Sequence, residues 1–478
     1  MLFNSFDFAL YLPIVFILYW FVFNKQLKTQ NAFLVIASYV FYGWWDWRFL
    51  SLILFSTLVD FSIGLYLSKA KKVKTRKLLL WTSIIVNLGL LGFFKYFNFF
   101  IDNLSQSFHF FGQDMTFTGL EIILPVGISF YTFQTLSYTI DVYKGKLEPT
   151  KDFLSFAAFV SFFPQLVAGP IERAKHLLPQ FYKNRKFDYA KAVDGMRQIL
   201  WGLFKKIAIA DSCAVFANDI FNNYETYNGS TLFIGALFFT LQIYGDFSGY
   251  SDIAIGTSRL FGFDLKRNFA YPYFSRDIAE FWRRWHISLS TWFRDYLYIP
   301  LGGSRGGTFQ KVRNTFIIFI VSGFWHGANW TFIIWGFLNA LYFLPLLLRN
   351  KNRVYTGNIA EGKLFPSFKE FRGMLITFAL TLIAWVFFRA ENINHAFAYL
   401  DGMFSASLFS LPEIRPKDVF VLIFVFFCVE WFGRDKKYAL EYLNFNKYLR
   451  WLLYVIIIVL VYLFGSNSEN VEFIYFQF

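Results

Sequence analysis

Apolar stretches alternate with short polar ones along almost the whole chain. The first stretch, MLFNSFDFALYLPIVFILYWFVF, has neither a basic start nor a small-residue cleavage site, so we expect an uncleaved first span. Similar stretches recur at about 31–45, 49–67, 78–101, 121–141, 198–218, 231–258, 314–328, 331–348, 373–390, 419–433 and 451–465. The pattern predicts an all-α polytopic membrane protein with about 11–12 transmembrane helices.

Two segments depart from this pattern. DFLSFAAFVSFFPQLVAGP at 152–170 contains Pro164, Gly169 and Pro170, which predict a broken helix that is re-entrant or interfacial. The segment 259–313 is too charged to span the membrane, yet it interleaves tryptophan with arginine, as an interfacial helix or a pocket rim does. We expect one membrane-embedded domain over residues 1–478, with core motifs at about 121–348.

Lysine and arginine are distributed unevenly among the loops. KAKKVKTRK at 69–77 is strongly basic, whereas 102–120 and 219–230 contain neither residue type. Because basic residues in short loops stay on the cytoplasmic side, we expect 69–77 and 259–313 to face the cytosol. Counting spans from these loops predicts that both termini face outward.

The composition supports a membrane location. Of the 478 residues 56% are hydrophobic and 16% charged, against roughly 25% charged in soluble domains. The net charge of +14 follows the same loop bias, so we expect a multi-pass membrane protein with no nucleic-acid partner. Cys213 and Cys428 lie in or beside apolar segments without a CxxC or Cys/His neighbour, and no metal site is predicted.

One histidine lies in an almost wholly apolar run. His326 occurs in FIVSGFWHGANWTFIIWG, with Trp325 and Asn329 close by. An apolar site disfavours imidazolium, so this side chain is expected to be neutral near pH 7 and able to accept a proton. It is either a general base or a structural histidine bonded to a backbone carbonyl.

His286 is the second candidate, in FWRRWHISLSTWFRDYLYIPLGG. The charges of Arg283 and Arg284 would disfavour its protonated form as well. It is either an interfacial histidine satisfied by headgroups and water, or a group that binds a donor or handles protons. The remaining histidines lie in predicted loops and are expected to be solvated: His109, His176 and His395.

Carboxylates also fall within an apolar stretch. QIYGDFSGYSDIAIG at 242–256 contains Asp246 and Asp252, and a carboxylate there must be paired or line a hydrated cavity. Asp252 has Arg259 or the nearby basic segment as a partner, while Asp246 forms an interhelical ion pair or contacts substrate. LGGSRGG at 301–307 lacks the GK[ST] ending of a phosphate-binding loop, so we interpret it as a cytosolic turn.

Several of these blocks together resemble a known family. FWRRWHISLSTWFRDYLYIPLGG, followed about 40 residues later by SGFWHGANWTFIIWG, resembles the prokaryotic membrane-bound O-acyltransferases (MBOAT) of the alginate O-acetyltransferase branch. Further blocks are similar to the same branch: VGISFYTFQTLSYTIDVY, FPQLVAGPIER, YGDFSGYSDIAIG, the opening MLFNSFDFALYLP and the terminal FIYFQF.

The resemblance implies a fold and an activity. The fold would place transmembrane and re-entrant helices around a central tunnel. The enzyme would move an acetyl or other acyl group from a cytosolic thioester, acetyl-CoA or an equivalent, to hydroxyls of an extracytoplasmic polysaccharide or a partner protein, as in alginate biosynthesis. No permanently bound cofactor is implied. The implied partners are membrane lipids and an extracytoplasmic SGNH-type acetyltransferase or other exopolysaccharide machinery.

The resemblance also assigns site residues. His326 matches the family's essential active-site histidine, and His286 matches a second, supporting one. The resemblance does not assign a group that stabilises the oxyanion; Asn329 and Trp325 are candidates from their place beside His326, and Asp246 is a further supporting candidate. The candidates for binding donor phosphates share a guanidinium group on the cytosolic side: Arg283, Arg284, Arg294 and Arg305.

Two other functions stay open from the sequence. A carrier protein could deliver a D-alanyl group to teichoic acid within the same family. A proton- or ion-coupled transporter would use the intramembrane histidine and aspartate as a pathway, but it would favour paired repeats of broken helices, which are not visible.

Overall fold

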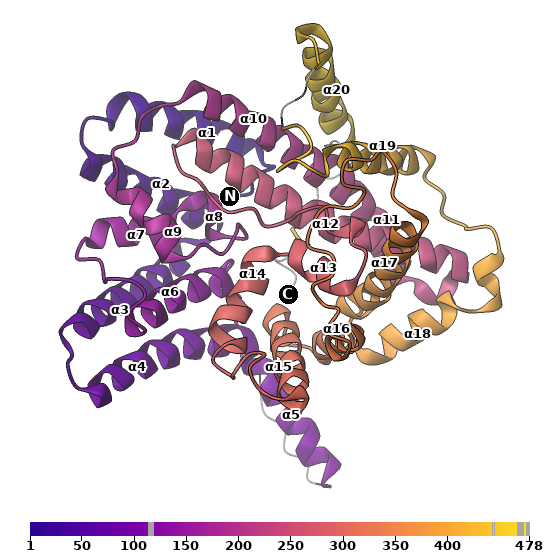
Figure 1. Cartoon of the computed structure of the whole chain (residues 1–478), viewed down its shortest axis with the longest axis horizontal. Coiled ribbons are helices and arrows are strands. Elements are labelled where there is room, and N and C mark those ends of the chain that lie inside the picture. Colours follow the sequence, from indigo (N-terminus) through magenta and orange to yellow (C-terminus); the bar gives the residue numbers. More distant parts are fainter. Residues whose placement is uncertain (113–118, 442, 444, 466–472, 475–478) are drawn as a thin grey trace. The chain divides into compact units, whose positions relative to one another are not determined.

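A computed structural model describes residues 1–112, 119–441, 443, 445–465, 473 and 474. All regular structure in these residues is helical and none is strand, which confirms the predicted all-α class (Figure 1). The predicted outward loop 102–120 lies partly outside the described residues, as does most of the terminal FIYFQF. The chain divides into two compact units, and the single-domain expectation stays a prediction, as does the central tunnel.

Unit 1 comprises Met1–Ala192 and Thr257–Leu265. Its helices are α1 (Phe6–Ile17), α2 (Leu27–Asp46), α3 (Leu50–Lys69), α4 (Val73–Leu91), α5 (Phe97–Phe110), α6 (Ile128–Tyr143), α7 (Phe153–Ser161), α8 (Phe163–Leu166) and α9 (Ala174–Leu177). Helices α3, α4 and α6 pack on one another, and α7 packs on α2 and α3 (Figure 1).

Unit 2 comprises Val193–Gly256 and Lys266–Phe478. Two helices contain residues of both units, α10 (Tyr189–Leu203) and α12 (Gly229–Leu260). The others are α11 (Ser212–Asn222), α13 (Ile278–Arg284), α14 (Ile287–Phe293), α15 (Thr308–His326), α16 (Trp330–Leu348), α17 (Phe368–Arg389), α18 (Ile393–Met403), α19 (Lys417–Gly433) and α20 (Lys447–Gly465). A π-helical stretch, Phe204–Asp211, continues α10.

Shorter elements connect these helices. The π-helical ones are Leu18–Val22, Gly92–Tyr96 and Arg294–Tyr298. The 3₁₀ turns are Trp47–Phe49, Leu178–Tyr182, Tyr224–Thr226, Pro272–Phe274 and Ala406–Phe409.

Six helical runs of the described chain are long and apolar enough to cross a membrane: Leu27–Lys69, Val73–Phe110, Gly229–Leu260, Trp330–Leu348, Phe368–Arg389 and Lys447–Gly465. The first holds two of the predicted spans, because the extended backbone of Asp46 (φ −159°, ψ 111°) ends α2 before α3 begins. Phe6–Val22 is a shorter apolar helix. The protein is therefore a multi-pass membrane protein, although several predicted spans form shorter or more polar helices.

The segment 152–170 contains two short helices. The nine residues of α7 are too few to cross a bilayer, which takes about 20. The chain turns at Phe162 (φ −52°, ψ 105°), just before Pro164 at the start of α8. Because proline lacks the amide proton that would continue the first helix, the break agrees with the predicted broken helix.

A buried carboxylate joins three helices of unit 1. Asp60 on α3 is completely buried. It accepts hydrogen bonds from Ser83 Oγ of α4 (2.5 Å), Thr139 Oγ1 of α6 (2.8 Å) and Asn87 Nδ2 of α4 (2.8 Å). Asn87 Oδ1 in turn accepts from Thr135 Oγ1 on α6 at 3.1 Å. Polar side chains between apolar helices act here as interhelical links.

Replacing Asp60 with Ala should destabilise unit 1. The substitution leaves three donors without their acceptor in an apolar interior, and we expect a loss of roughly 2–4 kcal/mol in the free energy of unfolding. Unfolding in detergent by heat or SDS measures this loss. Asp102→Ala, which removes an exposed aspartate on α5, is the matched control. Equal stability of the two variants would contradict a linking role for Asp60.

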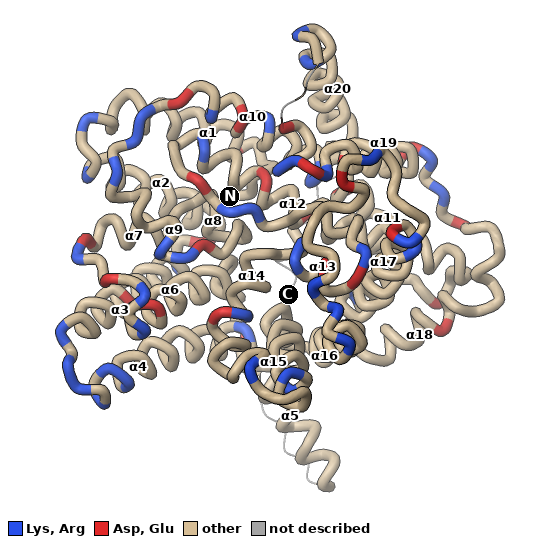
Figure 2. Tube along the Cα trace, in the orientation of Figure 1, with Lys and Arg blue, Asp and Glu red and all other residues tan. Residues whose placement is uncertain are grey.

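The topology prediction can be tested at described, exposed positions. Basic residues gather in the loop between α3 and α4 (Figure 2). In a variant with both native cysteines replaced by Ala, a membrane-impermeant maleimide added to intact cells should label Gln106→Cys on α5 but not Lys71→Cys, because basic loops stay inside. Labelling of Lys71→Cys alone would invert the orientation.

Candidate functional site

Glycines bring the backbones of α10 and α12 close together in unit 2. A Cβ atom on Gly202 would lie 2.7 Å from the carbonyl oxygen of Gly249, and one on Gly249 would lie 2.8 Å from the carbonyl oxygen of Gly202. A Cβ on Gly245 would lie 2.9 Å from the carbonyl oxygen of Lys205. Gly245 and Gly249 have the spacing of a GxxxG motif, which permits such close helix contact in membranes. This contact places the π-helical stretch against α12.

Two lysines of the π-helical stretch pair with the aspartates of α12. Lys206 Nζ lies 2.9 Å from Asp246 Oδ1 and 2.7 Å from Asp211 Oδ1, and Lys205 Nζ lies 2.5 Å from Asp252 Oδ2. All five side chains are buried. The interhelical ion-pair interpretation of Asp246 therefore describes its contacts.

The pairing suggested for Asp252 with Arg259 needs correction. Asp252 Oδ2 pairs with Lys205, and its other oxygen, Oδ1, accepts a hydrogen bond from Gln198 Nε2 at 2.6 Å. Both carboxylate oxygens of Asp252 are therefore engaged by Lys205 and Gln198. Arg259 lies about two helical turns farther along the same helix. Lys205 comes from a neighbouring helical stretch whose backbone approaches α12 closely at the glycines. Only tertiary contact brings that lysine to Asp252.

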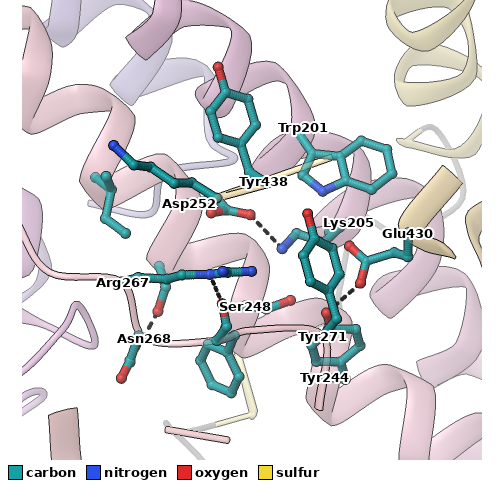
Figure 3. A pocket seen from close by; sticks show the side chains of 14 residues that line it. Trp201, Lys205, Tyr244, Ser248, Asp252, Arg267, Asn268, Tyr271, Glu430 and Tyr438 are labelled. Carbon is teal, nitrogen blue, oxygen red and sulfur yellow. Dashed lines mark hydrogen bonds and ion pairs between the residues drawn. The ribbon is translucent and has the colours of Figure 1, made fainter. Parts of the chain in front are cut away.

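A small charged cavity adjoins this pair. Its volume is about 10 Å³, room for roughly one water. Figure 3 shows Lys205, Asp252 and Glu430 around it, and Tyr244 donates to Glu430 Oε2 at 2.6 Å. The remaining lining residues include aromatic, polar and basic side chains: Trp201, Ser248, Ser251, Ile255, Arg267, Asn268, Phe269, Tyr271, Lys437 and Tyr438.

Asn268 connects the cavity to His286. The asparagine is completely buried, and its Nδ2 donates to Ser251 Oγ of α12 at 3.3 Å. Its Oδ1 accepts from the Ser288 amide at 3.1 Å and from Ser288 Oγ at 2.9 Å, and it lies 3.2 Å from His286 Nδ1. With Oδ1 as acceptor, Nδ1 of the neutral imidazole carries the proton and Nε2 carries the lone pair.

His286 lies inside the protein and not at a solvated rim, so the interfacial interpretation is wrong. Only 1% of its surface is exposed, and its ring packs on Phe247 (4.5 Å between centroids) and Phe269 (6.2 Å). Burial lowers the pKa of His286 to about 3, and the neighbouring arginines are not the cause. The residue adopts a left-handed backbone (φ 42°, ψ 55°) between α13 and α14, which turns the ring inward.

His326 ends α15 within an aromatic cluster. It is 4% exposed, and its ring lies 5.0 Å from Trp325, 5.2 Å from Trp335 and 5.3 Å from Phe388. The ring of His286 lies 6.3 Å from the same Trp325. The structure therefore brings the two candidate histidines together around one tryptophan, although 40 positions separate them in the chain.

Glycines also determine where His326 lies. A Cβ on Gly323 of α15 would lie 2.2 Å from the carbonyl oxygen of Phe332, and one on Gly336 of α16 would lie 2.4 Å from that of Phe319. The α15–α16 hairpin therefore requires glycine at both positions. This close contact holds Trp335 of α16 against the histidine.

Asn329 has both ends of its amide engaged. Its Oδ1 accepts from the Thr331 amide at 3.0 Å, which caps α16, and its Nδ2 donates to the carbonyl oxygen of Glu391 at 2.7 Å. These contacts favour a role in holding the turn after His326. Trp325 is the supporting candidate that touches both histidines.

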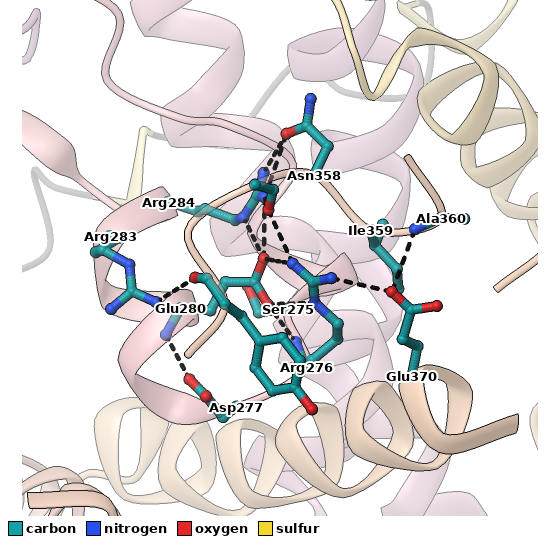
Figure 4. Close-up of polar contacts among 12 residues, drawn as sticks. Ser275, Arg276, Asp277, Glu280, Arg283, Arg284, Asn358, Ile359, Ala360 and Glu370 are labelled. Carbon is teal, nitrogen blue, oxygen red and sulfur yellow. Dashed lines mark hydrogen bonds and ion pairs between the residues drawn. The ribbon is translucent and has the colours of Figure 1, made fainter. Parts of the chain in front are cut away.

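Two of the four candidate arginines hold a loop (Figure 4). Arg283 donates to the carbonyl oxygens of Asn352 (2.8 Å) and Tyr355 (2.6 Å). Arg284 pairs with Glu280 at 2.9 Å and donates to the carbonyl oxygen of Gly357 at 2.9 Å. Their guanidinium groups therefore support the segment 349–367.

The other two candidate arginines are exposed. Arg294 pairs with its neighbour Asp295 at 2.8 Å, with 58% of its side chain exposed. Arg305 is exposed in the LGGSRGG turn. The prediction that His395 is a solvated loop histidine is wrong. Its side chain is buried and stacks on Tyr224 at 4.5 Å between ring centroids.

Sequence reasoning missed several residues that organise the site. Asn268, Lys205 and Glu280 are buried polar residues. The partners of Asn268 and Lys205 come from other elements, whereas Glu280 pairs with Arg284, four residues along the same helix. Glu280 also pairs with Arg276 at 2.9 Å. A signal was present in each case, because a charged or amide side chain among aromatic residues is costly unless it is paired.

Comparison with known proteins identifies the family. The chain is 42% identical over 436 residues to the "Probable alginate O-acetylase AlgI" of Pseudomonas aeruginosa, a match covering 90% of this chain and 80% of that protein. The sequence profile described as "MBOAT, membrane-bound O-acyltransferase family" matches residues 150–353, which include both histidines. The chain belongs to the membrane-bound O-acyltransferase family. It is an acyltransferase, as the sequence motifs predicted.

Other members of the family act on other acceptors. A peptidoglycan O-acetyltransferase of Helicobacter pylori is 36% identical over 444 residues, covering 87% of this acyltransferase and 82% of that protein. A teichoic acid D-alanyltransferase of Streptococcus thermophilus is 30% identical over 300 residues, covering 57% and 70%. The transporter alternative is therefore set aside.

Proposed function

We propose that this acyltransferase moves an acetyl group from a cytosolic thioester, acetyl-CoA or an equivalent, to hydroxyls of an extracytoplasmic polysaccharide. The observation that supports the proposal is the buried pair of His326 and His286, both packed against Trp325. The proposed location is the cell inner membrane. The proposed partners are an SGNH-type acetyltransferase or polysaccharide machinery on the outer side, and no permanently bound cofactor is required.

His326 is the proposed general base. It takes the proton from the acceptor hydroxyl while that oxygen attacks the thioester carbonyl carbon. The carbon–sulfur bond then breaks, the ester stays on the acceptor, and the proton passes from His326 to the departing thiolate. The aromatic rings around His326 keep water from competing with the acceptor hydroxyl.

His286 is proposed as a supporting residue. Burial lowers the pKa of His286 and favours its neutral form, and Asn268 engages its Nδ1, which suits the ring to a positioning role. Its Nε2 lone pair, directed by the bond between Nδ1 and Asn268, suits it to accept a hydrogen bond from the donor or from the acceptor hydroxyl. Asp246 is proposed to support the site indirectly and not to contact substrate, because its carboxylate is paired with Lys206.

The similarity to known proteins favours acetyl transfer over D-alanyl transfer. Identity to the alginate O-acetylase relative is 42% over 90% of the chain, against 30% over 57% for the D-alanyltransferase. An acetyl group on a polysaccharide is therefore the first reaction to assay.

Replacing His326 with Gln tests the base. Glutamine keeps much of the size and hydrogen bonding but cannot take up the proton, so acetyl transfer should fall by about 10²–10⁴-fold. His286→Gln should cost less, because it removes positioning rather than proton transfer. Thiol release from acetyl-CoA by membrane vesicles, with alginate as acceptor, measures both.

His109→Gln is the control for these variants, because it alters an exposed histidine of unit 1. It should leave transfer unchanged. Transfer that survives His326→Gln but disappears with His286→Gln would reverse the two roles.

Arg294 and Arg305 are proposed to meet the phosphates of the donor, because both guanidinium groups are exposed on the predicted cytosolic side. The double variant Arg294→Gln/Arg305→Gln should raise the KM for acetyl-CoA by about tenfold with kcat little changed. Lys71→Gln/Lys72→Gln removes the same charge from another cytosolic loop and serves as control. An unchanged KM in the arginine variant would exclude this contact.

A further inference from the structure

An apolar groove lies at the beginning of α17 in unit 2. Its volume is about 560 Å³, within the roughly 300–1,000 Å³ of small-molecule sites. It is lined by apolar side chains alone: Phe365, Pro366, Phe368, Phe371, Met374 and Trp431. Phe365 is 73% exposed and Phe368 is 81% exposed, so the described chain leaves the rim of the groove uncovered.

The floor of the groove is held rigidly. Trp431 Nε1 donates to the carbonyl oxygen of Leu364 at 2.9 Å, and the guanidinium of Arg434 lies 4.4 Å from the Trp431 ring centroid. Arg434 also donates to the carbonyl oxygens of Lys363 (2.5 Å) and Ala360 (3.1 Å). Met374 and Trp431 pack on the buried cluster that contains Tyr271 and Phe274. The groove is therefore formed before any ligand binds.

The groove lies at the level where a membrane helix begins. Phe368–Arg389 is one of the six long apolar helices, and its first turn is fixed by a capping box of Ser367 and Glu370. Tryptophan at such a level is typical of the membrane interface. The preceding segment 349–367 is rich in lysine and arginine, which places this end of α17 at the cytosolic leaflet.

Basic side chains run beside the apolar ones on α17. Lys369 and Arg372 each follow a groove phenylalanine, Phe368 and Phe371, so helical spacing makes a basic stripe parallel to the apolar stripe. Both basic residues are exposed.

The acidic residues of this segment do not cancel the basic stripe. Glu370 accepts a hydrogen bond from Ser367 Oγ and forms an ion pair with Arg276 at 3.0 Å. Glu361 is exposed, and Lys363, also exposed, offsets its charge. A net positive rim beside an apolar groove suits an amphiphile with an anionic head.

We propose that this groove binds one anionic phospholipid of the cytosolic leaflet. An acyl chain lies along Phe368, Phe371 and Met374, and the phosphate is bound by Lys369 and Arg372. The site lies on the surface of unit 2, apart from the histidine pair, and a bound lipid would brace the start of α17.

Photolabelling of the full chain in nanodiscs tests the site. The probe is phosphatidylglycerol or phosphatidylcholine with a diazirine in one acyl chain, and mass spectrometry maps the labelled peptides. We expect labelling within 363–374 and at Trp431, with phosphatidylglycerol about tenfold above phosphatidylcholine, because two basic residues select the anionic head. Equal labelling by the two lipids would overturn the proposal and leave an ordinary annular contact.

Three variants separate the contribution of the basic residues from that of the apolar groove. Lys369→Gln/Arg372→Gln should bring phosphatidylglycerol labelling down to the phosphatidylcholine level. Phe368→Asp alters an exposed position in the first turn, where an aspartate is compatible with the helix, and should abolish labelling by both lipids at the groove. Lys71→Gln/Lys72→Gln removes the same charge elsewhere and should change nothing. Equal loss in this control would show that general surface charge, and not the groove, attracts the lipid.

Discussion

A charge between apolar helices is costly unless an opposite charge or hydrogen-bond donors lie beside it, and unit 2 meets this requirement with ion pairs. Lys205 and Lys206 meet Asp252 and Asp246 because glycines let α10 and its π-helical continuation approach α12 at backbone distance. A side chain at Gly202 or Gly249 would separate the helices and leave Lys205, Asp246 and Asp252 without their ionic partners, while Lys206 would keep Asp211. The close contact and the ion pairs therefore depend on each other.

The same helix also supports the histidines. Ser251 of α12 accepts from Asn268, Asn268 fixes the tautomer of His286, and His286 lies against Trp325 beside His326. Neutral hydrogen bonds thus run from the charged cavity to His286, whose ring contacts the aromatic cluster around His326. The ion pairs thus provide rigidity where charge is matched, and aromatic rings surround both imidazoles.

Two arginines of the segment 259–313 hold a loop of the protein. Arg283 and Arg284 satisfy backbone carbonyls of 352–357, so much of their hydrogen-bonding capacity is used inside the protein. Glu280, buried between Arg276 and Arg284, makes this arrangement possible. Composition alone does not distinguish an arginine that holds a loop from one that is available to bind a phosphate, because both kinds lie among tryptophans near a membrane surface.

The sequence by itself determined the membrane class, the helical architecture and the family, and it singled out His326 and His286. The lengths of the apolar stretches and the rare aromatic blocks are local properties of the chain, so they can be recognised from the sequence alone. Only the tertiary structure decided that His286 is buried, that Lys205 rather than Arg259 pairs with Asp252, and that Asp60 joins three helices. Burial and pairing depend on which distant segments pack together, and no window of the sequence contains both partners of such a contact.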